Sequence, residues 1–141
     1  MRIILFRGKS TKSHKWVYGD LHLLCDAPHI HTEPTSYPYA GKRTFVDECT
    51  IGQFTGIYDK KGSPIYEGDI IGCDNPKIKH LIFYNEKQGR FMAALDGKTE
   101  DNFFGVCGLD DARWISSKEV IGNIYDNPEL IYNDNNDLSY L

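Results

Sequence analysis

Residues Ile51 to Ile71 read IGQFTGIYDKKGSPIYEGDII, and this segment carries the clearest structural signals in the chain. Two short runs with β character are joined by Asp59-Lys60-Lys61-Gly62, whose glycine can adopt the positive φ that closes a hairpin loop. A second turn, Glu67-Gly68-Asp69, leads into an apolar run that begins at Ile70. The segment therefore predicts a β-hairpin followed by a tight turn into another strand.

The composition extends this β character to the whole chain. The 141 residues include nine Tyr, seven Phe and two Trp, and such side chains favour strands. Thirteen glycines and six prolines add frequent turns. A chain of this length can bury a core of its own. We find no signal peptide and no apolar run of the roughly 20 residues that a membrane helix needs, so we expect no membrane partner.

The charge balance argues against binding to nucleic acid. The net charge is −4, whereas proteins that neutralise phosphates normally carry a basic surplus. One acid-free basic run keeps nucleic acid as an alternative partner. It lies in the expected N-terminal hairpin and comprises Arg2, Arg7, Lys9, Lys12 and Lys15.

A second phrase near the C-terminus, Glu119 to Ile131, reads EVIGNIYDNPELI. Together with QFTG, DKKG and IYEGDI in the central segment, and with Trp16-Val-Tyr-Gly-Asp-Leu21, it resembles the YopX family of small phage and prophage proteins. The resemblance implies a phage- or prophage-derived accessory protein and brings no established molecular function. We interpret the shared residues as builders of turns and strands. They are Phe54, Thr55, Gly56, Asp59, Gly62, Tyr66, Glu67, Gly68, Asp69, Gly122, Asn123, Tyr125, Asn127 and Pro128.

These signals predict a mainly β fold, specifically a small SH3-like or related partly open β-barrel. We expect a single YopX-like domain over 1–141. Its parts are an N-terminal β-hairpin (1–25), an irregular Pro- and His-rich loop (26–43), the barrel core (44–127), and a short helix and tail (128–141). In the tail, Asp126 or Asn127 can cap a helical turn that begins at Pro128.

Histidines in the 26–43 loop raise the question of a metal site. If this segment were a strand, alternation would place His29, His31 and Glu33 on one side, with His22 nearby, and imidazole suits zinc or nickel. Because the pair lies between prolines, we interpret His29 and His31 as surface residues of a loop. We therefore expect no metal and no cofactor, and we keep these two histidines as weak candidates.

The remaining reactive side chains do not form a catalytic pattern. The cysteines at 25, 49, 73 and 107 are too far apart for a CxxC pair, and we expect reduced, mostly buried thiols. Cys49 or Cys107 could act as a nucleophile only beside a histidine base. Glu67 and Asp69 could form a carboxylate pair, but Asp69 is better explained as an acceptor within its turn.

The chain is therefore expected to be a non-enzymatic protein of the cytoplasm of a bacterial host. Its β domain would bind an unknown protein partner or assemble as a homo-oligomer. The alternative is a nucleic-acid-binding accessory factor that uses the basic N-terminal hairpin.

Overall fold

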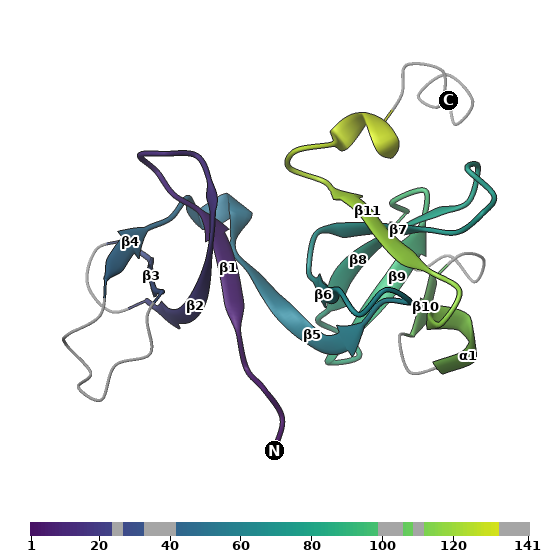
Figure 1. The fold of residues 1–141 in the computed structure, drawn as a ribbon, viewed down its shortest axis with the longest axis horizontal. Helices are drawn as coiled ribbons and strands as arrows, with labels where there is room; N and C mark the ends of the chain where they lie inside the picture. The colour runs from purple at the N-terminus through teal and green to yellow at the C-terminus, as the bar shows by residue number, and fades with distance from the viewer. Residues whose placement is uncertain (24–26, 33–41, 99–105, 109–111, 133–141) are drawn as a thin grey trace. The chain divides into compact units, whose positions relative to one another are not determined.

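The computed structural model describes residues 1–23, 27–32, 42–98, 106–108 and 112–132. Strands dominate these ranges, and the expected mainly β fold is confirmed. The chain divides into two compact units, Met1–Gly56 and Ile57–Leu141 (Figure 1). The division falls within strand β5 (Gly52–Tyr58) and not at the 26–43 segment, where the sequence placed the change from hairpin to barrel.

The first unit is built on antiparallel strands in the order β4-β3-β2-β1-β5. Strand β3 and the first residue of strand β4 fall within the segment 26–43, which was expected to be an irregular loop. That expectation is therefore wrong at 29–31 and at residue 43. Residues 33–41 lie outside the described ranges. The strands that precede β5 are β1 (Phe6–Lys9), β2 (Trp16–His22), β3 (His29–His31) and β4 (Arg43–Phe45).

Strand β1 begins only at Phe6, although apolar residues precede it. Ile3 and Ile4 lie before β1 and are exposed, at 60% and 54%. Arg7, within β1, is instead only 5% exposed, and its guanidinium lies 4.5 Å from the centre of the Trp16 ring. The contact between the Arg7 cation and the face of the Trp16 ring favours burial of this charged side chain.

The second unit contains a sheet in the order β10-β9-β8-β7-β11, and β5 runs into this unit to pair with β6. Its strands are β6 (Pro64–Tyr66), β7 (Asp69–Gly72), β8 (Lys79–Asn85), β9 (Arg90–Leu95), β10 (Val106–Gly108) and β11 (Glu119–Asn123). The α-helix α1 (Ala112–Ile115) precedes β11.

Strand β7 contributes to the core on both of its faces. Ile71 packs with Ile65, Ile82 and other apolar residues on one side, whereas Ile70 packs with another cluster on the opposite side. Successive strand residues point to opposite faces of the sheet. Because an apolar cluster covers each face, both Ile70 and Ile71 are fully buried. Phe54 and Ile65 are also buried, and Ile57 packs against the cluster that contains Ile71.

The C-terminal helical turn is present as the 3-10 helix η2 (Pro128–Leu130), with proline at its start. Asn127 occupies the N-cap position but does not cap the helix with its side chain. Its Oδ1 instead accepts the N–H of Asn123 at 3.2 Å. A second 3-10 helix, η1 (Glu48–Thr50), was not expected from the sequence and is capped by Asp47, which accepts the Cys49 N–H at 3.0 Å.

The SH3-like barrel stays a prediction, as does the single-domain description. Within the described ranges, no helix is long and apolar enough to cross a bilayer.

Candidate functional site

The hairpin loop of the central segment is tied to β11 through Asp59. This carboxylate is 7% exposed and accepts the N–H groups of Lys61, Ser63 and Val120 at 2.8–2.9 Å. Burial alone would raise the pKa of Asp59, but these three backbone donors outweigh it and hold the pKa below its ordinary value. Lys61 also pairs with Glu119 at 2.8 Å. The central segment and the C-terminal phrase are therefore joined by hydrogen bonds.

A second connection between the two phrases is made at Gly68. Its N–H donates to the carbonyl of Ile82, and its carbonyl accepts the N–H of Ile124, both at 2.8 Å. The backbone has φ +85°, and a Cβ built here would stand 2.8 Å from Cε2 of Tyr125. Both the conformation and the close approach of the tyrosine ring require glycine at this position.

Asp69 and Asn123, which are paired across β7 and β11, direct the local turns. The side chain of Asp69 accepts the N–H of Tyr66 at 2.8 Å and is only 2% exposed. Asn123 Oδ1 accepts the N–H groups of Tyr125 and Asp126, and its Nδ2 donates to the Asp126 carboxylate. The carboxylate of Asp69 thus binds the backbone of its own turn, and this contact supports a structural role for the residue.

The other residues shared with the YopX phrases also lie in strands and turns. A Cβ on Gly122 would lie 2.6 Å from Oδ1 of Asn127. The glycine therefore leaves room for the Asn127 side chain, which accepts the N–H of Asn123. Phe54 is buried in β5, and Thr55 and Gly56 follow it in the same strand. Gly62 closes the hairpin loop with φ +82°, and Glu67 is half-buried. Pro128 begins η2.

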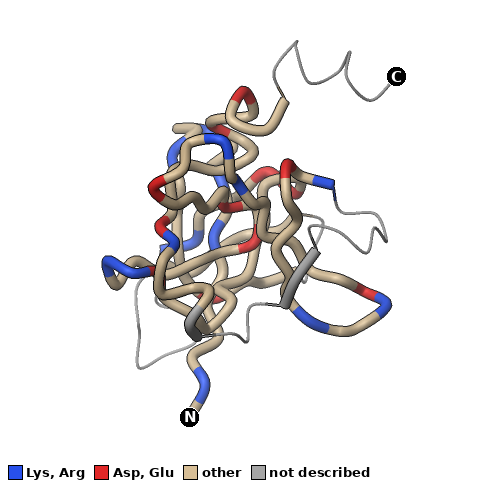
Figure 2. Tube along the Cα trace, turned by 90° about the vertical axis from the view of Figure 1, so that its right-hand side faces the viewer, with Lys and Arg blue, Asp and Glu red and all other residues tan. Residues whose placement is uncertain are grey.

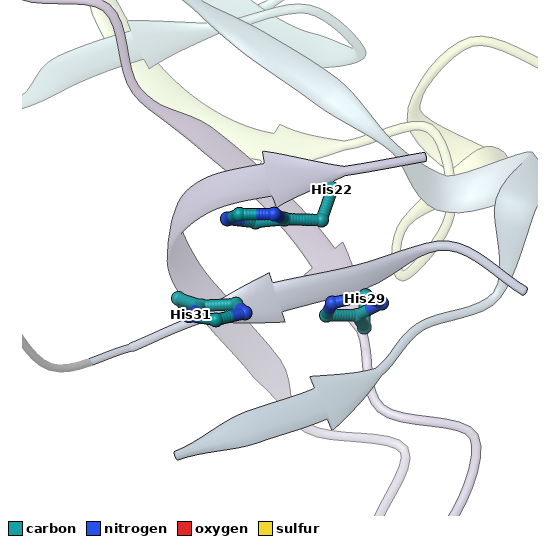
Figure 3. A group of neighbouring side chains, drawn as sticks. All are labelled: His22, His29 and His31. Carbon is teal, nitrogen blue, oxygen red and sulfur yellow. The ribbon is translucent and has the colours of Figure 1, made fainter. Parts of the chain in front are cut away.

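The structure brings together a set of histidines that the sequence left as weak candidates. We call His22, His29 and His31 the histidine cluster. Strands β2 and β3 pair so that His22 lies directly opposite His29, with His31 two residues further along β3. Figure 3 shows the His22 side chain on one strand beside His29 and His31 on the next. One nitrogen from each ring lies within 4.8 Å of the others.

Backbone packing sets these positions. Ile30, between the two β3 histidines, is fully buried on the opposite face of the sheet, so alternation directs His29 and His31 to one side. A Cβ on Gly19 of β2 would collide with the carbonyl oxygen of His31. The glycine therefore allows β3 to approach β2 closely enough for the rings to stack, with centroids 4.0 Å apart for His22 and His31.

The cluster has charged and aromatic neighbours on the same face. Asp20 is paired with His31 from β2, and Arg43 is paired with it from β4. Desolvation lowers the pKa of His31, and the nearby His22, His29 and Arg43 lower it further, whereas Asp20 acts in the opposite direction. His31 is thereby biased toward its neutral form, the form that binds metals.

His29 is the most buried member, at 7% exposure. Its Nδ1 lies 3.4 Å from the carbonyl oxygen of Ala27, and its ring meets Phe45 edge-on. An Nδ1–H donated to that carbonyl leaves Nε2 as the free lone pair of this ring. The Ala27 carbonyl thus favours the tautomer of His29 that carries its proton on Nδ1.

A separate histidine, His80 on β8, is buried in the second unit. It is 7% exposed, and its ring meets Trp114 edge-on with centroids 4.9 Å apart. Desolvation, helped by the positive charge of Lys118 and opposed by Asp96, lowers the pKa of His80 to about 4. This environment keeps the imidazole neutral and fits a core residue.

We expect acid to destabilise the protein through His80. The pKa is about 4 in the folded state and 6.5 ordinarily, so between these pH values the unfolded chain binds a proton that the folded chain does not. This contribution to stability is complete above pH 6.5 and is lost as the pH falls to 4, by about 2–3 kcal/mol. Denaturant unfolding of wild type and His80→Phe across this range measures it. An equally steep loss in the variant would contradict the assignment.

Of the two cysteines that the sequence allowed as nucleophiles, only the Cys49 side chain lies among the described residues. Cys49 is exposed and Cys73 is half-buried, and both are free thiols. The expectation of mostly buried thiols is therefore wrong for Cys49, because η1 turns it toward solvent. Cys49 has no histidine among its contacts with the described residues. Cys25 and the Cys107 side chain lie outside what is described.

A hollow of about 440 Å³ opens on the first unit beside the turn after β1. Its lining includes both signs of charge, with Lys9 and His14 near Asp47 and Glu48. Ser10 also borders it, but its hydroxyl oxygen accepts the N–H groups of Lys12 and Ser13 and so shapes the turn. The histidine cluster is the stronger candidate for a site, because its donor atoms converge.

Fold and cluster together define a small, mainly β protein with two compact units, one of which presents three converging imidazoles. The chain belongs to the YopX protein family, whose model matches residues 5–132. No curated protein matches the chain. Among solved structures, the crystal structure of protein EF1440 from Enterococcus faecalis is similar, with 28% identity and a TM-score of 0.59. The match covers 94% of this chain and 100% of that one.

Proposed function

We propose that this YopX protein is a non-enzymatic accessory protein, of phage or prophage origin, that binds a partner protein or a second copy of itself. We place it in the cytoplasm of a bacterial host. The observation that carries the proposal is the exposure of Ile3 and Ile4, at 60% and 54%. These apolar residues lie ahead of β1 with their side chains in solvent.

The backbone beside these residues is already held in place. The Leu5 carbonyl accepts the N–H of Phe54 on β5 at 2.8 Å. An apolar segment anchored at one end can present its side chains to a partner at a lower entropic cost than a free tail. Phe45 and Tyr18 of the same unit are also about half exposed, at 48% and 45%. Exposed apolar side chains of this kind are typical of surfaces that bind proteins.

The experiment compares wild type with the double variant Ile3→Ser, Ile4→Ser. Tyr132→Ser is the matched control, because Tyr132 is 57% exposed in the other unit. Sedimentation over a wide concentration range reports self-association, and affinity purification from cells that carry the native element reports a partner. We expect either association to be lost in the double variant and retained in the control. Association that the double variant keeps, or a monomer that retains no protein, would overturn the proposal.

The nucleic-acid alternative has less support from the arrangement of the basic residues. Arg7 is buried over Trp16, and the ammonium of Lys9 lies 5.5 Å from the centre of the same ring. Figure 2 shows acidic as well as basic residues along the described trace. Counterion release requires several cations on one phosphate track.

We therefore expect only weak binding to duplex DNA, single-stranded DNA or RNA, with a Kd of about 10⁻⁴ M or weaker at physiological salt. Fluorescence anisotropy with labelled oligonucleotides measures it. Submicromolar binding that disappears when Lys9, Lys12 and Lys15 are changed to Glu would make nucleic acid the leading partner.

A further inference from the structure

We propose that His22, His29 and His31 bind one divalent transition-metal ion, and that zinc is the ion that the site takes. The three side chains come from two paired strands and offer imidazole nitrogen alone. Imidazole is a borderline donor that suits zinc, copper and nickel, and it does not suit calcium or magnesium, which require oxygen. The proposal is independent of the partner surface at Ile3 and Ile4.

The spacing of the donor atoms is close to what zinc requires. Nitrogens that bind a tetrahedral zinc ion at 2.0–2.1 Å stand about 3.4 Å from one another. The three rings offer nitrogens that all lie within 4.8 Å of one another. Rotations of the imidazole rings about their side-chain torsions close a difference of this size, and the paired strands need not move.

The register of the strands makes the convergence specific. His22 and His29 form a directly opposed cross-strand pair, and His31 is the diagonal neighbour of His22. Side chains at such positions are within reach of one another. The Ala27 carbonyl, 3.4 Å from Nδ1 of His29, can accept a proton held on that nitrogen, and Nε2 is then available to the metal.

Simple packing of histidines is the competing explanation. Stacked imidazoles do occur as ordinary cross-strand contacts, and the ring centroids are 4.0–5.3 Å apart. Packing alone, however, does not require histidine at all three positions. It would also be served by any aromatic residue, as Phe45 shows beside His29. A metal ion accounts for the presence of histidine at all three positions, each with one ring nitrogen within 4.8 Å of the others.

Three protein ligands leave one position of a tetrahedral ion open, and water or a donor from another molecule can occupy it. Bound metal would also connect β2 to β3 through side chains as well as backbone. Because the ion binds only the folded arrangement, it stabilises the first unit by mass action. Metal binding and the thermal stability of this unit are therefore expected to rise together.

The experiment uses the full chain without a polyhistidine tag, freed of metal by a chelator. Zinc is titrated by calorimetry, and cobalt is titrated by visible absorption, which reports tetrahedral nitrogen coordination. We expect one ion per chain and a rise in the Tm. His22→Gln and His31→Gln, both at half-buried positions, should each weaken binding by about tenfold or more.

His14→Gln is the matched control, because His14 lies in the same unit but outside the cluster and is exposed. It should bind zinc as wild type does. Circular dichroism of each variant confirms that it is folded, which is why the buried His29 is left unchanged. The proposal is overturned if wild type takes up no zinc at saturation. It is equally overturned if folded His22→Gln and His31→Gln keep wild-type affinity, or if His14→Gln loses it.

Discussion

Replacing Gly68 with valine is expected to destabilise the protein by about 2–4 kcal/mol. The residue has φ +85°, where a β-branched side chain is strained, and its Cβ would come within 2.8 Å of the Tyr125 ring. The same residue holds Ile82 and Ile124 through its N–H and its carbonyl. Strain at this position therefore weakens the contact between the central segment and the C-terminal phrase. Urea unfolding monitored by fluorescence measures the loss.

Gly62→Val separates the two causes. Gly62 has nearly the same backbone angle, φ +82°, but a Cβ there would meet nothing within 4 Å. This variant should show the backbone strain alone, at about 1–2 kcal/mol. An equal loss of stability in both variants would mean that the close approach of Tyr125 contributes nothing.

The local features of the fold could be predicted from the sequence because they depend on neighbouring residues. The loop at 59–62 closes with a positive φ at Gly62, as the hairpin pattern predicted. Proline begins the last helical turn, as expected from its fixed φ. The buried isoleucines of β7 were also visible as an apolar run.

The features that sequence reasoning missed depend on contacts between distant residues. Arg7 of β1 is buried against the ring of Trp16 on β2, a contact that no local pattern reveals. The segment around His29 was expected to be a loop because it lies between prolines. It becomes a strand because β2 and β4 supply hydrogen-bonding partners on its two sides.

The histidine cluster illustrates the same limit. Alternation within one strand was enough to place His29 and His31 on a common side if a strand formed. That His22 would lie directly opposite His29 depends on the register between β2 and β3, and Gly19 permits the close approach of these strands. The glycine was the one signal in the sequence that could have indicated a tight strand pair.

Asp59→Ala is expected to cost about 2–4 kcal/mol, because it leaves the N–H groups of Lys61, Ser63 and Val120 without their shared acceptor. Asp47→Ala is the matched control, since Asp47 is exposed and its carboxylate accepts only the N–H of Cys49 in the described contacts. Loss of that single cap should cost about 0.5–1 kcal/mol. Chemical denaturation that ranks the two variants in the reverse order would show that Asp59 does not join the hairpin loop to β11.

The three hydrogen bonds that Asp59 accepts should also make the stability of the protein depend on pH. Its pKa in the folded state lies below the ordinary value of 3.8, because the backbone donors outweigh the effect of burial. The stability that it contributes is therefore complete above pH 3.8 and is lost as the pH falls through the lower folded value. The loss due to His80 occurs between pH 6.5 and about 4, so the two groups act in separate ranges. Asp59→Asn should flatten only the more acidic part of the curve, whereas flattening of the part above pH 4 would contradict this division.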